Sequence, residues 1–208
     1  MSAQKLAISD AVAHPPSMFK TIAVSALMLT AKAMASEPLL TAGYEFSDEK
    51  GGFRIIHASG LGTQSDPIVL RFVISSHQPS TLVIRATRPI NPFAHPRTHA
   101  TGTLYFDIRA QNQTGQPWVA TEFELQENWQ RPSMFGDGLS FDQRREGEKA
   151  FSANAYATYR LDFEPYDRLL FEDGVVNPQA TGQFSLLVTD LTPVKEFFLQ
   201  FDPQVPAI

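Results

Sequence analysis

The chain has 208 residues, which is enough for one domain of ordinary size but too few for two large ones. Hydrophobic residues make up 43% of it and charged residues 19%, a balance that excludes a disordered chain and a coiled coil. The lack of cysteine excludes a disulfide framework, a Cys-ligated zinc site and a thiol nucleophile, and the net charge of −5 gives no electrostatic reason to bind nucleic acid.

Residues 18–35 are typical of a secretory signal peptide. Lys20 precedes a largely apolar run, and a small-x-small cleavage pattern, Ala-Met-Ala, ends at Ala35. We therefore expect residues 1–35 to be a signal peptide with an apolar helix, with Met18 as an alternative start, and the mature protein to be periplasmic or extracellular. The run is too short for a membrane anchor, so none is expected after cleavage. Because three lysines and one aspartate leave with this segment, the mature net charge is −7. A buried amphipathic helix is the alternative interpretation.

Apolar and polar residues alternate with a period of two in much of the remaining chain, which predicts strands. Turn-forming residues separate these runs at 112–117, 172–174 and 177–182. We therefore expect residues 36–208 to form a single all-β domain, an antiparallel two-sheet sandwich of immunoglobulin-like or jelly-roll type with about eight to ten strands. The alternating runs lie at 68–75, 81–86, 102–110, 118–127, 159–163, 184–188 and 197–201.

The Pro-rich segment 87–99 predicts an irregular loop, because proline cannot donate to a sheet ladder. It contains His95 and His99, four residues apart, which is the spacing of two zinc ligands on one helical face in metalloproteases. Pro96 follows the first histidine and no glutamate stands beside it, so neither a helix nor a zinc site is predicted here.

Two tryptophans flank the segment 119–127. Its apolar residues are expected on one face and its polar residues on the other, that is, Val119, Phe123 and Leu125 against Glu122, Glu124 and Gln126. Trp118 begins this strand on the glutamate-bearing face, and Trp129 falls in the loop that follows. Exposed aromatic rings beside carboxylates bind sugars in β-sandwich carbohydrate modules, so both tryptophans are candidate ligand-binding residues. The alternative is that both rings pack against the domain.

Residues 136–148, with the sequence GDGLSFDQRREGE, place acidic side chains around a small apolar pair. Asp137 and Asp142 are candidates for ligand binding, for an acid–base pair or for a calcium site, because hard cations prefer carboxylate oxygens. Their spacing matches no known calcium loop, whereas Asp-Gly is a strong turn signal. We favour a turn that Asp137 shapes, with Leu139 and Phe141 pointing inward. We expect no cofactor, and calcium is the alternative.

Four stretches carry a resemblance to a known group of proteins: GLGTQSDPIVL, NQTGQPWVATEFELQE, DGLSFDQ and LLFEDGVVNPQATGQFSLLVTDLTPVKEFFLQFDP. Together they resemble uncharacterised secreted proteobacterial β-sandwich proteins related to those with PEP-CTERM sorting tails. The chain departs from that group by closing on PQVPAI, without a Pro-Glu-Pro motif, an apolar helix or a basic tail. The resemblance implies export and a sandwich fold, and it carries over no catalytic residues.

No nucleophile elbow, P-loop or dinucleotide fingerprint occurs, so no catalytic residue is predicted. The expected function is that of an exported, non-catalytic β-sandwich with a structural or interaction role in the envelope or extracellular matrix. Its partners would be proteins or polysaccharides of the envelope. The alternative is a carbohydrate-binding or glycan-processing module that uses the loop 129–142.

Overall fold

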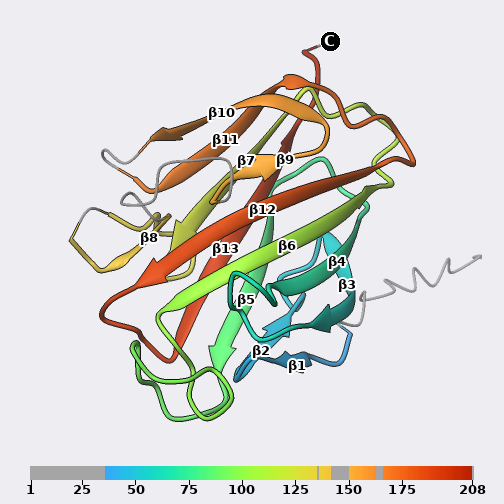
Figure 1. Ribbon diagram of the computed structural model, residues 1–208. Coiled ribbons are helices and arrows are strands. Elements are labelled where there is room, and N and C mark those ends of the chain that lie inside the picture. The colour runs from blue at the N-terminus through green and yellow to red at the C-terminus, as the bar shows by residue number, and fades with distance from the viewer. Residues whose placement is uncertain (1–35, 135, 142–149, 163–165, 208) are drawn as a thin grey trace, which may run out of the picture. The chain divides into compact units, whose positions relative to one another are not determined.

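The computed structural model describes residues 36–134, 136–141, 150–162 and 166–207, and these form two stacked β-sheets without a helix (Figure 1). One sheet has seven strands, in the order β1 (Leu39–Thr41), β2 (Tyr44–Ser47), β5 (Ser80–Ala86), β13 (Glu196–Gln204), β7 (Ala120–Gln126), β11 (Arg168–Gly174) and β10 (Tyr156–Asp162). The other sheet contains β3 (Phe53–Ser59), β4 (Ile68–Ile74), β6 (Thr103–Asn112), β12 (Thr181–Asp190) and β8 (Leu139–Phe141), and β9 (Ser152–Ala153) also pairs with β12. The sheets do not close into a barrel, so the predicted all-β sandwich is confirmed.

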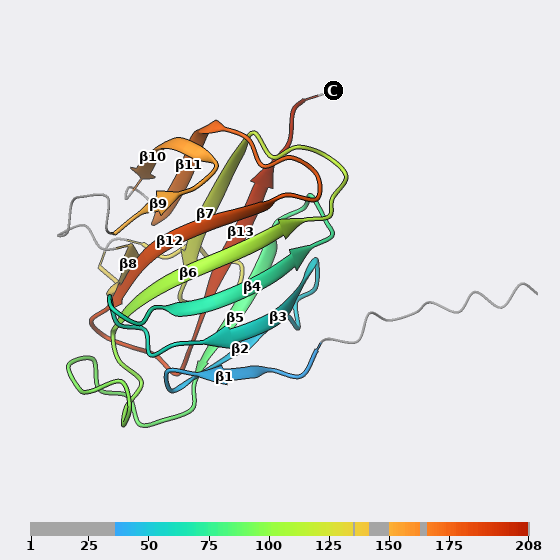
Figure 2. The ribbon, with the colours of Figure 1, turned by 45° about the vertical axis from the view of Figure 1, so that its right-hand side comes forward.

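One pair of neighbouring strands departs from the antiparallel arrangement that the sequence predicted. β4 and β6 are parallel, with Ile68 opposite Phe106 and Ile74 opposite Asn112. Between these two strands the chain crosses to the other sheet to form β5, and such a crossover allows it to return in the same direction. The other strand pairs that the structure describes are antiparallel. Figure 2 shows the strands of the two layers crossing at an angle.

The core lies between the two sheets and contains many aromatic rings. Phe123 on β7 makes edge-to-face contacts with Phe171, Phe184 and Phe201, with ring centroids 6.1, 5.2 and 5.3 Å apart. Such contacts contribute about 0.5–1.5 kcal/mol each beyond the burial of the rings. Phe184 belongs to the six-stranded sheet and the other three rings to the seven-stranded sheet, so this cluster joins the two layers.

The predicted alternation is correct in β6 and only partly correct before and along β7. Leu104, Phe106 and Ile108 on β6 are all buried, as expected. Val119 is 41% exposed, although it was expected beside the buried residues of β7. It precedes the first residue of that strand, and its backbone N–H donates to the carbonyl of Gln204.

The Pro-rich segment 87–99 contains no strand, as predicted. The backbone N–H groups of Thr98 and His99 both donate to the carbonyl of His95, which forms a tight turn. The Nδ1 atom of His95 accepts a hydrogen bond from the Arg97 backbone, and that of His99 lies 3.0 Å from the Thr98 hydroxyl. Both imidazoles are therefore engaged within their own loop.

The described residues, from Ser36 onward, cluster as one compact unit. The predicted signal helix falls in residues 1–35, which lie outside the described residues. Among the residues that the structure does describe, no helix has the length and apolar character needed to cross a bilayer.

Candidate functional site

The carboxylate of Asp137, in the connection between β7 and β8, is used to fold that connection. Its Oδ2 accepts hydrogen bonds from the Ser133 hydroxyl at 2.7 Å and the Met134 backbone N–H at 2.9 Å. Its Oδ1 accepts one from the Leu139 N–H at 3.0 Å. The prediction that Asp137 shapes a turn is confirmed.

The residues after this turn point into the core. Leu139 and Phe141 are 2% and 0% exposed, and the Phe141 ring packs edge-to-face on Phe151 with centroids 6.2 Å apart. Gly138 introduces the strand with a φ of +96°, a conformation that favours glycine, and a Cβ there would lie 2.3 Å from the Thr192 hydroxyl. The apolar pair therefore fills the core, as the sequence predicted.

Trp118 has no exposed ring face for a sugar, which corrects its assignment as a candidate ligand-binding residue. The side chain is 0% exposed, and its ring packs edge-to-face on Phe201 with centroids 5.4 Å apart. Its Nε1 donates to the Thr114 hydroxyl at 3.3 Å. Trp118 precedes β7 and pairs with Val176, so it does not follow the alternation that places the glutamates of β7 on the other face.

Trp129 has the exposure that a sugar-stacking ring needs. It is 49% exposed, and the Nζ atom of Lys50 lies 4.0 Å from the ring centroid in a cation–π contact. Lys50 follows β2 and Trp129 follows β7, and β5 and β13 lie between these two strands in the sheet. The contact therefore reaches across the outer face of the seven-stranded sheet, the face turned away from the core.

Gln126, the last residue of β7, holds the connection between β7 and β8 against this outer face. Its Oε1 accepts a hydrogen bond from the Gln130 backbone at 2.9 Å, and its Nε2 donates to Glu124 at 2.8 Å. Gln126 and Glu124 are 2% and 4% exposed, although the sequence placed them on a solvated face. Phe198, opposite Gln126 in register, is buried as well. We attribute this burial to the connection that folds back over the sheet.

Arg168 on β11 lies next to Glu124 on the same outer face. Its Nη2 and Nε lie 2.7 and 2.8 Å from Glu124 Oε2, and its Nε lies 3.7 Å from Glu122 Oε1. Gln200 on β13 accepts a hydrogen bond from Gln126 at 3.3 Å. We call Glu122, Glu124, Gln126, Arg168 and Gln200 the polar row. Its charge-assisted bonds hold donors and acceptors in fixed positions beside the connection that carries the exposed tryptophan.

A second charged cluster on this face centres on Arg85 of β5. Arg85 contacts Glu49 at 2.7 Å, Glu45 at 3.3 Å, and Glu196. The hydrogen bond from Arg85 lowers the pKa of Glu49 to about 2. Lys50 lies 3.9 Å from Glu49, so the cluster extends to the tryptophan ring that Lys50 covers.

Two buried acids lie near β8. Asp167 and Asp190 are 2% and 6% exposed, and burial raises the pKa of each to about 6. Asp167 accepts a hydrogen bond from the Ser140 hydroxyl at 2.9 Å, and Asp190 accepts one from the Thr192 backbone at 3.1 Å. Both carboxyl groups thus have partners within the fold.

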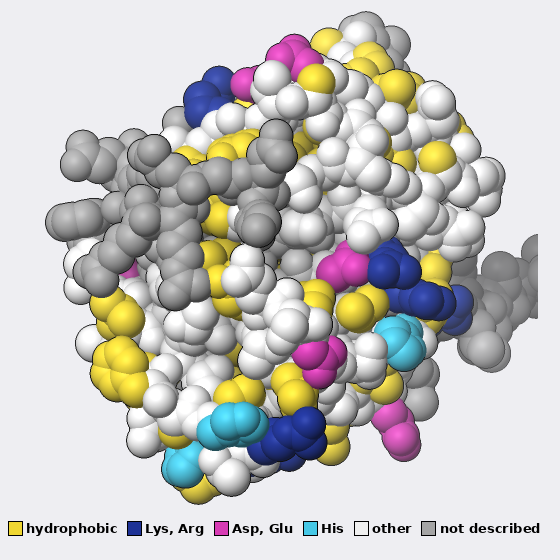
Figure 3. Space-filling model, in the orientation of Figure 1, with side chains coloured by type: hydrophobic (Ala, Val, Ile, Leu, Met, Phe, Trp, Pro, Cys, Tyr) yellow, Lys and Arg dark blue, Asp and Glu magenta, His cyan; other side chains and the backbone are white. Residues whose placement is uncertain are grey.

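The candidate calcium pair is only half described, because Asp142 lies outside the described residues. Within the described part of the chain, no group of three or more histidine, aspartate or glutamate side chains is arranged to hold a metal ion. The outer face of the six-stranded sheet, shown in Figure 3, carries charges of both signs side by side. There Arg109 lies 2.7 Å from Asp107, and the strand registers place Arg71 beside Arg109 and His57 beside Arg71.

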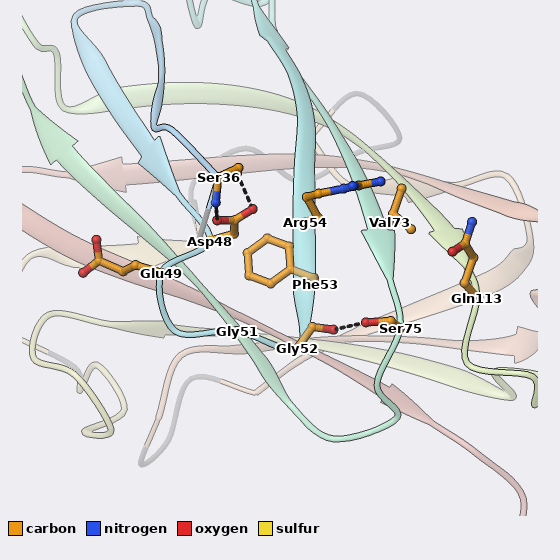
Figure 4. A pocket seen from close by; sticks show the side chains of 10 residues that line it. All are labelled: Ser36, Asp48, Glu49, Gly51, Gly52, Phe53, Arg54, Val73, Ser75 and Gln113. Atoms are coloured by element: carbon orange, nitrogen blue, oxygen red, sulfur yellow. Dashed lines mark hydrogen bonds between the residues drawn. The ribbon is translucent and has the colours of Figure 1, made fainter. Parts of the chain in front are cut away.

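A cavity of about 340 Å³ opens where the turn after β2 meets β3 and β4 (Figure 4). In its wall, Ser36 and Asp48 are hydrogen-bonded to each other. Its lining consists of Ser36, Asp48, Glu49, Gly51, Gly52, Phe53, Arg54, Val73, Ser75 and Gln113.

Sequence reasoning named Asp137 and Trp129 as candidates, but it predicted neither the polar row nor the hydrogen bonds of Asp48. The alternation Glu-x-Glu-x-Gln at 122–126 placed three polar groups on one face, yet it contained no sign that the following loop would cover them. Arg168 comes from a distant part of the chain, and only the strand pairing brings it to Glu124. Comparisons with protein-family models, with curated proteins and with solved structures found no match.

Proposed function

We propose that the protein is an exported, non-catalytic β-sandwich with a structural or interaction role in the envelope or extracellular matrix. The observation that supports this proposal is the use of its buried and half-buried carboxylates. Asp48, Glu124 and Asp137 each accept at least two hydrogen bonds from within the fold. A catalytic acid or base must exchange a proton with a substrate, whereas these groups are committed to holding strands and turns together. The partner would be a protein or a polysaccharide of the envelope.

Export is tested by expressing the full chain in a Gram-negative host and analysing the periplasmic fraction and the medium. We expect the intact mass of the exported protein to correspond to a chain that begins at Ser36, because the cleavage pattern ends at Ala35. Protein that stays in the cytoplasm with residues 1–35 attached would contradict the proposed localisation.

A second candidate function, carbohydrate binding, is favoured by the half-exposed ring of Trp129 near the polar row. An aromatic face binds the apolar side of a sugar ring, and fixed amide and carboxylate groups bind its hydroxyls. On this interpretation the binding surface is the outer face of the seven-stranded sheet, and it includes only the first part of the loop 129–142.

A glycan array with the mature protein tests this second function. We expect binding to a restricted set of sugars, with affinity reduced about tenfold or more by Trp129→Ala, since a stacking contact of about 1.4 kcal/mol corresponds to that factor. The matched control is Phe93→Ala, which removes a side chain that is 85% exposed in the loop 87–99. Uniformly absent binding, or binding that both variants weaken equally, would exclude carbohydrate recognition at this face.

A further inference from the structure

Ser36, the first described residue, is held by a buried carboxylate. Its backbone N–H donates to Asp48 Oδ1 at 3.0 Å, and its hydroxyl donates to Oδ2 at 2.6 Å (Figure 4). Asp48 is 4% exposed, and its Oδ2 also accepts the N–H of Ile55 on β3 at 3.0 Å. Asp48 follows β2 of the seven-stranded sheet, whereas β3 belongs to the six-stranded sheet. One carboxylate therefore ties the start of the sandwich to both layers.

The bond between Ala35 and Ser36 is also the bond at which the sequence predicts cleavage. Hydrolysis by a signal peptidase transfers the hydroxyl of water to the carbonyl carbon of Ala35 and a proton to the nitrogen of Ser36. That amine takes up a further proton at neutral pH, because an α-amino group has an ordinary pKa near about 8. The nitrogen that lies 3.0 Å from Asp48 then carries a positive charge and three donors in place of one.

We propose that removal of residues 1–35 converts this hydrogen bond into an ion pair between the α-ammonium group of the half-buried Ser36 and the buried carboxylate of Asp48, and that the pair holds β1 and β2 against β3. The inference rests on the proposed export. Before cleavage, the donors to this carboxylate among the described residues are neutral: the N–H groups of Ser36 and Ile55 and the Ser36 hydroxyl. After cleavage, it has a charge-assisted partner, and such bonds are roughly twice as strong as neutral ones. Processing thereby makes the sandwich more stable.

The charged side chains described near Asp48 do not form an ion pair with it in place of the ammonium group. Glu49 lines the same cavity but is bonded to Arg85. Arg54 also lines it, and Figure 4 shows its side chain directed toward Val73 and away from Asp48. Glu37, next to Ser36, is exposed and carries the opposite charge to the new amine.

The test compares three forms of the chain that ends at Ile208, since the residues from 36 onward contain all the described strands. One form begins at Ser36 with a free amine, the second begins at an acetylated Ser36, and the third retains Ala35. At pH 6.5 we expect the free-amine form to have a Tm about 5 °C or more above the other two. The difference should vanish in the Asp48→Asn background. It should also vanish as the pH rises through the pKa of the amine, because a pair that raises this pKa stabilises the fold only while the amine is charged.

Asp48 also accepts a hydrogen bond from Ile55, so the Asp48→Asn variant can fail to fold for that reason. A second measurement therefore uses the unsubstituted chain. The pKa of the Ser36 amine in the unsubstituted chain is obtained from the pH dependence of its reaction with an amine-labelling reagent. We expect a value raised above the ordinary range. Equal melting temperatures for the three forms, or an ordinary pKa, would overturn the ion pair. If the exported protein began at another residue, only the predicted cleavage site would be contradicted. The ion pair would still be tested, because each purified form has a defined first residue.

Discussion

Asp190, at the end of β12, illustrates how a single buried acid affects the stability of this fold. Burial is the main reason that its pKa is raised to about 6; the nearby charges of Glu127 and Asp137 act in the same direction, and the hydrogen bonds from the Thr192 and Val194 backbones act against it. A pKa raised above the unfolded value means that the protonated form is favoured in the folded state. Its contribution to stability is therefore complete below about pH 4 and is lost as the pH rises through about 6.

Asp190→Asn should remove this pH dependence while keeping an acceptor for the Thr192 backbone. Near pH 4 we expect the variant and the parent chain to have similar free energies of unfolding. At pH 7.5 the variant should be more stable by about 2–3 kcal/mol, because the shift in pKa corresponds to about 1.4 kcal/mol per unit. Urea unfolding at several pH values measures the difference. The control is Asp66→Asn, which changes an exposed aspartate in a turn. If the free energies of unfolding of the Asp190 variant and its parent changed with pH in the same way, burial of Asp190 would have no effect on the pH dependence of stability.

At the scale of elements, β8 is a three-residue strand whose main contribution is to the core. It pairs with β12, with Phe141 opposite Val188 and Leu139 opposite Asp190. The connection that precedes it is held by Asp137, so the turn and the strand act together: the turn sets the direction of the chain, and the strand then buries two apolar side chains.

Phe141→Ala should reduce the free energy of unfolding by about 3–5 kcal/mol, because removal of a fully buried phenylalanine leaves a cavity in a packed core. Thermal or urea unfolding of the variant measures the loss. Phe93→Ala should change stability by less than about 0.5 kcal/mol, since that ring is 85% exposed. If the two variants proved equally stable, β8 would not be a part of the packed core.

For the molecule as a whole, features that depend on neighbouring residues were predictable from the sequence. Alternation with a period of two is a local property of each strand, and it predicted the all-β class and the buried face of β6. The Asp137 turn was predictable for the same reason, because the hydrogen bonds of the Asp137 carboxylate reach only four residues back and two residues forward.

Features that join distant parts of the chain were decided only by the tertiary structure. Alternation says which residues share a face of a strand, but it does not say whether another segment covers that face, so Glu124 was expected in solvent and is instead buried beside Arg168. The parallel pairing of β4 and β6 depends on where the chain returns after it crosses between the sheets. The two tryptophans have the same side-chain chemistry, and only the packing of their surroundings places Trp118 in the core and leaves Trp129 half-exposed.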